Sequence, residues 1–411
     1  MLKRLKQLKY FCGLDLGSNV LKACLVCVRD EDNLDLLAVA EAPAIGIRET
    51  SINDITELSQ TINKLIVQVS QKSGIRVSAV TLGISSDVVS SRYSQAVIPL
   101  IDSGTKVISR HDIARVGEQA KLLGTALEED IIHDIPQYYK IDDVNTAQNP
   151  LGLMGRKLQG NLLLVLANAV RLRNLVKAVH QAGFEVDHVA LSSLAACDVV
   201  LDNTLKSGGV ALVDIGAHMT TVMFFHHNRL ADIQFIPWGG QNVSQALAQR
   251  LNVTMDIAEE IKKTHAMASK QASAQAAPGD ILIKREKGFL PISRVSVNEA
   301  VNWEIENLLT HLETVIKGSS LYHELAKGVV MVGGGSLLPG LMERIEERTN
   351  LLVQMGVATN GLNNPAIYAP VIGLGQMHYI QHKQRVIDLK SPVNLKDRLV
   401  SSVRDLCQEY F

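Results

Sequence analysis

Two stretches about half a chain apart share the pattern that most restricts how this chain can fold. In each, an apolar strand ends on an aspartate, a tight glycine-containing turn follows, and a second apolar strand leaves the turn. The first copy is FCGLDLGSNVLKACLVCV around Asp15, and the second is GVALVDIGAHMTTVMFF around Asp214. A repeated strand–turn–strand unit predicts an internal duplication, and therefore two similar α/β halves.

A D-x-G hairpin can hold a phosphate and a hydrated metal ion. Its glycine tolerates positive φ and lets successive turn N–H groups point at one anion. The aspartate at the mouth suits Mg²⁺, which keeps most of its waters and takes one or two carboxylates. D-x-G turns also occur in ordinary hairpins, but two copies favour a phosphate site. The expected phosphate-binding residues are Asp15, Gly17, Ser18 and Asn19 in one copy and Asp214 with Gly216 in the other, with both aspartates as metal ligands.

Length and composition are those of a soluble globular protein. At 411 residues the chain is long for one hydrophobic core, so two to three domains are expected. A formal charge of −1 argues against a nucleic-acid binder. No apolar run approaches the ~20 residues that span a bilayer, and the basic N-terminus leads into Asp15 instead of a long apolar segment. We therefore expect a cytoplasmic protein.

The five cysteines fit a reducing compartment, because their number is odd and a disulfide framework would use pairs. Cys24 and Cys27 form a C-x-x-C, which is also typical of metal and redox sites. In a strand, residues i and i+3 point to opposite faces, so one metal ion would not easily reach both. The favoured interpretation is two packed strand cysteines.

The remaining chain predicts alternating strands and helices with one interruption. Asn33 to Ile45 and Ser78 to Ile84 are strand-like, and a helix from about Asp54 to Ser70 carries an apolar face. Residues 87–163 do not continue the pattern, which indicates an inserted small α/β subdomain. A long amphipathic helix is predicted over about Ser296 to Lys317, and a loop is predicted at KQASAQAAPGD, from Lys270.

Two further segments could contact a nucleotide. The backbone of the turn GGGSLLPG can lie flat against a purine; its candidate residues are Gly333, Gly334, Gly335 and Ser336. Glu259 and Lys262 lie one helical turn apart, so that the carboxylate can reach a ribose hydroxyl while the lysine stem stacks on the base. The alternatives are a plain tight turn and a solvated i,i+3 surface pair.

The segments GLDLGSN, VDIGAH, AEEIK and VMVGGGSLLPG, in this order, resemble the phosphate and adenosine motifs of the actin-like ATPase superfamily. Within it, HDIPQYYKID followed by NPLGLMGRKL is similar to the bacterial cell-division family FtsA. The resemblance covers essentially the whole chain. It implies ATP and Mg²⁺ as cofactors and an actin-like two-lobed fold with a duplicated mixed-sheet core and an inserted small α/β subdomain.

The resemblance also implies a division into lobes. The insert would replace the small lobe of actin and lie on the other side of the first large lobe, and the second small lobe would dock the C-terminal peptide of the tubulin-like protein FtsZ. The expected ranges are 1–86 and 164–207 for the first large lobe, 87–163 for the insert, 208–240 and 318–380 for the second large lobe, 241–317 for the second small lobe, 381–394 for a linker and 395–411 for a membrane-targeting helix.

The chain departs from the family pattern in the second phosphate loop. Related proteins carry a further glycine and a threonine after D-x-G, where this chain has Ala217, His218 and Met219. The Cβ of Ala217 restricts the approach of phosphates, and His218 either contacts or blocks them. No side chain stands out as a base that activates water. Binding of ATP is therefore better supported than its rapid hydrolysis.

The C-terminal segment LKDRLVSSVRDLCQEYF predicts an amphipathic helix. Its apolar residues fall within an arc of about 160°, at 100° per residue. On composition alone, packing onto the body or dimerisation stays an alternative to membrane binding, because three basic residues are cancelled by three acidic ones. The resemblance favours an interfacial membrane anchor. The expected membrane-contacting residues are Leu395, Leu399, Val400, Val403, Leu406, Tyr410 and Phe411.

The implied function is an ATP-binding adaptor that anchors FtsZ filaments to the cytoplasmic face of the inner membrane at the division septum. It would self-associate into filaments and help to recruit later division proteins. The alternatives are a pilus-assembly adaptor on the same fold and a phosphotransferase or chaperone ATPase. A sugar kinase would need a catalytic aspartate on the substrate side and has little use for the terminal helix.

Overall fold

The computed structural model describes residues 9–30, 33–48, 51–101, 103–268, 280–285, 288–358 and 362–377. The predicted loop that begins at Lys270, the linker 381–394 and the terminal helix 395–411 lie outside the described residues, apart from Asp280 at the end of the loop. Among the described helices, none combines the length and the apolar character that a membrane span requires.

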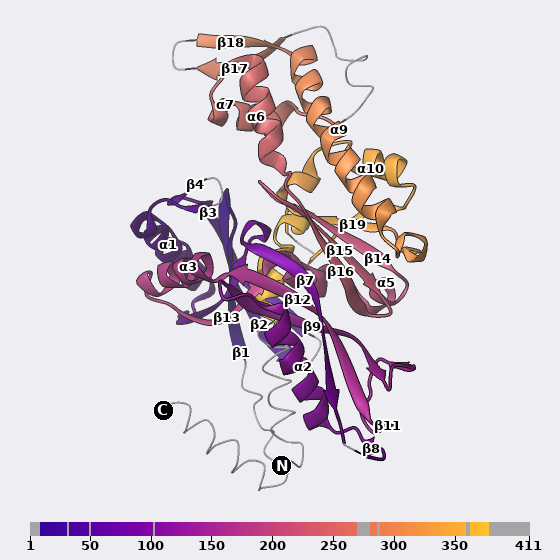
Figure 1. Ribbon diagram of the computed structural model, residues 1–411. Coiled ribbons are helices and arrows are strands. Elements are labelled where there is room, and N and C mark those ends of the chain that lie inside the picture. Colours follow the sequence, from indigo (N-terminus) through magenta and orange to yellow (C-terminus); the bar gives the residue numbers. More distant parts are fainter. Residues whose placement is uncertain are drawn as a thin grey trace, which may run out of the picture.

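The duplication predicted from the two hairpins is present as two five-stranded sheets of the same topology (Figure 1). In each sheet a three-stranded antiparallel meander is extended by two parallel strands. The first sheet has the order β13(Glu185–Leu191), β6(Ala79–Ile84), β1(Lys9–Leu16), β2(Val20–Asp30), β3(Asn33–Pro43). The second has the order β16(Arg229–Ile236), β15(Thr220–His226), β14(Val210–Ile215), β19(Val329–Val332), β20(Val353–Met355).

A helix covers the first sheet where the sequence predicts one. Helix α1(Ile55–Ser73) starts at Asp54, whose carboxylate accepts the N–H groups of Thr56 and Glu57, and ends at Gly74 with φ of 70°. It extends three residues beyond the predicted end. Helix α3(Ala169–Gln181) packs beside it. The apolar face of α1 is buried in the first core; its residues are Leu58, Ile62, Leu65, Ile66 and Val69.

The C-x-x-C cysteines are packed strand residues. Cys24 and Cys27 both lie on β2 and are buried, and the Cys24 thiol donates to the Val371 carbonyl. Burial raises the pKa of the Cys24 thiol to about 12, so the thiol stays protonated. This environment stabilises neither a thiolate nor a metal–sulfur bond.

The interruption between β6 and α3 is a small α/β layer, drawn in purple and magenta in Figure 1. It begins after the 3₁₀ turn Ser86–Val88 and has one main sheet, with α2(Arg110–Gly124) packed on it. The sheet order is β10(Asn145–Ala147), β9(Glu129–Ile141), β12(Lys157–Asn168), β7(Val89–Pro99), and β8(Lys106–Val107) pairs with β11(Met154–Gly155).

This insert contacts both halves of the molecule. Toward the first half, His133 Nε2 accepts the Leu191 N–H at 3.0 Å, and burial lowers the pKa of His133 to about 4, so the ring is neutral. Toward the second half, Tyr93 Oη donates to the Ala231 carbonyl at 2.6 Å and Ser91 Oγ to the Ile233 carbonyl at 3.1 Å. The insert is therefore hydrogen-bonded to the edge strand β16 of the second half.

The second half carries its extra elements at a different place, between β16 and β19. These are α6(Gly240–Leu251), α7(Met255–His265), the hairpin of β17(Asp280–Arg285) and β18(Gly288–Ser293), and α9(Arg294–Gly318). They form the small lobe at the top of Figure 1, and α9 continues from that lobe along the second sheet. The predicted helix over Ser296 to Lys317 is thus confirmed and is longer by two residues at its start and one at its end.

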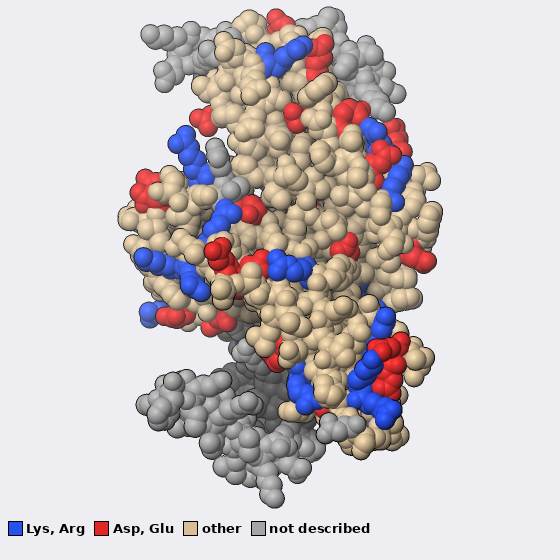
Figure 2. All heavy atoms as spheres, in the orientation of Figure 1, with Lys and Arg blue, Asp and Glu red and all other residues tan. Residues whose placement is uncertain are grey.

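Three shorter helices lie elsewhere in the described chain. Helices α4(Ser192–Val200) and α5(Asn203–Ser207) connect β13 to β14, and α10(Leu341–Thr349) comes after the 3₁₀ turn Gly334–Leu337. Another 3₁₀ turn, Pro365–Ile367, precedes a helix over 369–377. On the face shown in Figure 2, acidic and basic side chains are intermixed over all lobes.

Candidate functional site

One cavity of about 520 Å³ lies between the two halves. Of the fourteen nucleotide-contacting residues predicted from sequence, thirteen line it. The exception is Ser336, which is buried and donates its hydroxyl to the Gly333 carbonyl at 2.6 Å. The Ser336 side chain therefore stabilises the glycine turn without lining the cavity. The lining residues that the sequence predicts are Asp15, Gly17, Ser18, Asn19, Asp214, Gly216, Ala217, His218, Glu259, Lys262, Gly333, Gly334 and Gly335.

The two aspartates occupy the same place in the two sheets. Asp15 is the next-to-last residue of β1 and Asp214 the next-to-last residue of β14. Burial raises the pKa of Asp214, the neighbouring Asp15 adds to the rise, and a hydrogen bond from Ser193 opposes it. A carboxylate whose charge is costly in this way is stabilised by a cation.

A row of charged side chains crosses the first sheet beside Asp15. Lys22 lies opposite Asp15 on β2, and Glu41 lies opposite Lys22 on β3. Residues directly opposite in antiparallel strands share one face, and all three line the cavity. Lys22 and Glu41 were not predicted from the sequence. Lys22 places a positive charge near both carboxylates, and its charge lowers the pKa of Asp214.

The turns after the two aspartates meet across the cavity. His218 Nδ1 lies 2.9 Å from Ser18 Oγ, so one hydrogen bond joins the second turn to the first. The backbone of the second turn is fixed by the start of α6, because Gly240 N–H donates to the Gly216 carbonyl and Gln241 N–H to the Ala217 carbonyl.

The glycine turn closes the second half of the cavity. Gly333 has φ of 86°, and a Cβ at this position would lie 2.4 Å from Asp214 Oδ1. A Cβ on Gly335 would lie 2.3 Å from Ile215 Cγ2. Glycine at 333 and 335 lets this turn pack directly against the end of β14, whereas a Cβ on Gly334 would meet no atom within 4 Å.

Glu259 and Lys262 of α7 form a partly buried pair. Glu259 Oε2 lies 2.6 Å from Lys262 Nζ and accepts the Ser244 hydroxyl at 2.6 Å, while Lys262 Nζ donates to the Gly240 carbonyl at 3.0 Å. Burial lowers the pKa of Lys262; it pushes the pKa of Glu259 up, but the hydrogen bonds from Lys262 and Ser244 outweigh it and leave that pKa lowered. With side chains 22% and 17% exposed, Glu259 and Lys262 are not a freely solvated surface pair.

These residues fit a Mg²⁺-bound nucleoside triphosphate. Two carboxylates face one cavity, a lysine lies beside them, and an apolar side formed by Leu337, Leu338 and Ile367 can receive a base. Mg²⁺ needs only one or two carboxylates, because water and phosphate oxygens complete its coordination. Within the described residues there is no group of three histidine, cysteine or carboxylate side chains arranged for a metal. Asp15 and Asp214 are thus the candidate ligands.

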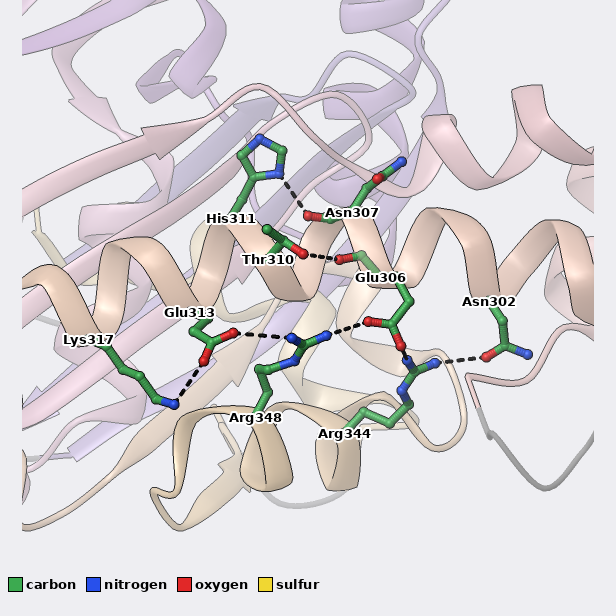
Figure 3. A network of polar contacts seen from close by, with 9 residues as sticks. All are labelled: Asn302, Glu306, Asn307, Thr310, His311, Glu313, Lys317, Arg344 and Arg348. Atoms are coloured by element: carbon green, nitrogen blue, oxygen red, sulfur yellow. Dashed lines mark hydrogen bonds and ion pairs between the residues drawn. The ribbon is translucent and has the colours of Figure 1, made fainter.

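A polar network joins α10, the helix that follows the glycine turn, to α9 (Figure 3). Helix α10 follows the turn, and its Arg344 donates to Asn302 Oδ1 at 2.8 Å and pairs with Glu306, both on α9. Arg348, one helical turn further along α10, also pairs with Glu306 and donates to Glu313 Oε2 at 3.2 Å. A displacement of the turn would therefore move α9 with it.

Comparison with known proteins gives one consistent result at the level of sequence. The family model described as "Cell division protein FtsA" matches residues 211–373, and the model "SHS2 domain inserted in FTSA" matches residues 87–166. The cell division protein FtsA of Borreliella burgdorferi is 27% identical over 401 residues, which cover 95% of this chain and 96% of that protein.

Solved structures show the same fold. The PilM–PilN type IV pilus biogenesis complex contains a chain with TM-score 0.65 and 16% identity, matched over 89% of this chain and 98% of that one. MreB5 of Spiroplasma citri bound to ADP has TM-score 0.54 and 10% identity, with 92% and 98% covered. The fold is therefore the actin-like one, with two lobes and an insert.

Proposed function

Because this chain belongs to the FtsA family of cell-division proteins, we propose that it is an ATP-binding adaptor that links FtsZ filaments to the cytoplasmic face of the inner membrane at the division septum. It self-associates into filaments and helps to recruit later division proteins. The observation that carries the nucleotide part of this proposal is the cavity between the halves, where Asp15 and Asp214 face one space.

Nucleotide binding is tested by titration of the purified full chain with a fluorescent ATP analogue in the presence of Mg²⁺. Saturable binding that unlabelled ATP displaces supports the proposal, and the absence of any binding contradicts it. The structural relative that contains ADP shows that this fold accommodates a nucleotide in another protein. For the present chain, the support is its own set of carboxylates, Lys22 and turn amides.

In this proposal, the main effect of the nucleotide is on the conformation of the chain, and its hydrolysis is secondary. ATP biases the approach of the halves and thereby self-association. Support comes from the turn at Gly333, which contacts Asp214 on one side and leads into α10 and its network with α9 on the other. Sedimentation of filaments with ATP, ADP or no nucleotide tests this role; equal sedimentation in all three would reject it.

The second small lobe is the proposed docking site for the C-terminal peptide of FtsZ. Support comes from Trp303 on α9, a large aromatic residue of this lobe that is 71% exposed. Exposed tryptophans are favoured anchors for peptides. Replacement of Trp303 by alanine should weaken binding of a labelled FtsZ peptide about tenfold or more. Val170→Ala, which removes an exposed apolar side chain of the first half, is the matched control.

The proposed membrane anchor is the predicted helix 395–411. Its support is the sequence pattern, since it lies outside the described residues. A single short helix binds reversibly, so polymerisation strengthens attachment by multivalency. Deletion of residues 395–411 should abolish flotation with liposomes while the thermal unfolding of the body stays unchanged. Full flotation of the truncated chain would reject the anchor.

The pilus-assembly alternative rests on the shared fold, since the pilus relative is only 16% identical. Binding to an FtsZ tail peptide, as against a peptide from a pilus inner-membrane protein, separates the two. Strong ATP turnover stimulated by a small substrate would instead favour the phosphotransferase alternative.

A further inference from the structure

Two consecutive serines hold the carboxylates of both halves. Ser192 Oγ donates to Asp15 Oδ1 and Ser193 Oγ donates to Asp214 Oδ2, each at 2.6 Å. Both serines are buried, with exposed fractions of 7% and 3%, and both line the cavity. Each hydroxyl engages one oxygen of its carboxylate, so each aspartate is held at one oxygen by α4.

The position of α4 explains how one helix reaches both halves. It follows β13, an edge strand of the first sheet, and precedes β14, the central strand of the second sheet. Successive residues of a helix point about 100° apart, so Ser192 is directed to one half and Ser193 to the other. One short helix therefore holds a carboxylate of each half by a hydrogen bond.

Small residues bring α4 this close to the first sheet. Gly83 lies beside Asp15 on β6, and a Cβ at Gly83 would come within 2.5 Å of Ser192 Oγ. On the other side, a Cβ at Gly373 would come within 1.9 Å of the Ala195 carbonyl. These two contacts leave α4 little freedom to slide, since backbone carbonyls and buried hydroxyls cannot give way cheaply.

We propose that Ser192 and Ser193 are positioning residues for a divalent cation shared by the two halves. They orient one carboxylate from each half at the cavity, where Asp15 and Asp214 would both be available as ligands of one hydrated metal ion. Hydrogen-bond partners of metal ligands fix ligand orientation, and their removal typically lowers metal affinity by 10–100-fold. This inference rests on the proposed binding of Mg²⁺–ATP.

The test measures how ATP affinity depends on Mg²⁺ in the full chain and in Ser192→Ala and Ser193→Ala. Each variant should need about tenfold more Mg²⁺ for its half-maximal effect on ATP affinity. Its affinity for ATP in excess EDTA should stay within about twofold of the unchanged chain. Gly83→Ala should also raise the Mg²⁺ requirement, because the added methyl group would lie 2.5 Å from Ser192 Oγ. The same methyl group would lie 2.3 Å from Leu374 Cδ1, so the serine variants give the more specific measurement.

Ser94→Ala is the matched control, because Ser94 is a buried serine of the insert whose hydroxyl binds the Ala120 carbonyl away from the cavity. It should leave both affinities unchanged. Thermal unfolding shows which variants are folded, and either serine variant suffices for the measurement.

The outcomes are distinct. An equal loss of ATP affinity with Mg²⁺ and with EDTA would overturn the positioning role and make the serines purely structural. ATP affinity that is independent of Mg²⁺ in the unchanged chain would also overturn it, while the proposed ATP binding would survive. If the unchanged chain binds no ATP under either condition, the proposed function fails together with this inference.

Discussion

In the first half, the residues across the sheet from Asp15 are Lys22 and Glu41, whereas in the second half the residues across the sheet from Asp214 are Thr221 and Phe235. The strands, their order and the position of the aspartate are the same in both halves. The row of charged side chains is therefore present in the first half only. Thr221 is buried, and its hydroxyl lies 2.5 Å from the Ser86 hydroxyl, so Thr221 belongs to the contact surface between the two halves.

The extra elements are also placed differently. The first half carries its insert after β6, and the second carries its small lobe after β16. The second position brings α7, with Glu259 and Lys262, to the cavity. Its position after β6 places the insert away from the cavity and against β16. The comparison shows that two sheets of the same topology present different side chains to the cavity. Both halves supply an aspartate, the first half adds Lys22 and Glu41, and the second adds Glu259 and Lys262 through its small lobe.

The largest expected effect tests whether both halves contribute to one metal site. Asp15→Asn and Asp214→Asn should each reduce the Mg²⁺-dependent part of ATP affinity by about 100-fold or more, because a metal ligand is lost outright. Calorimetric titration with and without Mg²⁺ provides the measurement. Asp143→Asn, an exposed carboxylate of the insert, is the control. A large loss in only one of the two aspartate variants would show that the two halves do not both contribute to one metal site.

A smaller effect is expected for the lysine that the second half lacks. Lys22→Met should weaken ATP about tenfold, because hydrogen bonds to charged groups contribute about 1.5–3 kcal/mol. Its affinity for adenosine should stay unchanged, since the lysine lies with the carboxylates. Lys64→Met on the exposed side of α1 is the control. Equal losses for ATP and adenosine would place Lys22 outside the phosphate site.

The contact between the two turns should contribute about 1 kcal/mol to the stability of the nucleotide-free chain, the usual net value of a neutral hydrogen bond. Ser18→Ala and His218→Ala remove the same contact, so their effects on unfolding should not add in the double variant. Denaturant titration of the four chains measures this coupling. Additive losses would show that the two turns are energetically independent.

The smallest effect concerns pH and the Asp214 carboxyl. Its pKa is raised in the folded chain by burial and by Asp15, so the folded state binds this proton more tightly than the unfolded state does. Its ionisation therefore destabilises the fold as pH rises through the raised pKa, and the cost is absent below the unfolded pKa of about 3.9. Asp214→Asn should raise the Tm of the nucleotide-free chain at pH 7 by about 1–3 °C. An unchanged or lower Tm would contradict this sign.

The hairpins, the glycine turn and the apolar face of α1 could be predicted from sequence because each is a local pattern. Lys22 could have been found as well, since the turn after Asp15 fixes the register of the hairpin and places Lys22 opposite it. Glu41 could not, because register shifts between Leu25 and Val26 and again near Asp30 defeat simple counting along β2 and β3.

The proposed roles of Ser192 and Ser193 could not be predicted from the local sequence pattern. The segment SSLAACDVV predicts a helix of small residues, but its place beneath both aspartates results from the packing of Gly83 and Gly373 against it. Ser336 is the opposite case: the glycine run suggested a ligand contact, whereas the side chain turns back onto the Gly333 carbonyl. Sequence patterns therefore located the site, whereas tertiary packing determines which side chains line it.

The most direct test of a single site shared by both halves is a crystal structure of the chain with ATP and Mn²⁺ in place of Mg²⁺, in which anomalous scattering locates the metal. We predict one metal ion between the Asp15 and Asp214 carboxylates, with the base beside the turn at Gly333. A metal ion bound by only one of the two aspartates, or His218 in the place of a phosphate, would contradict this account.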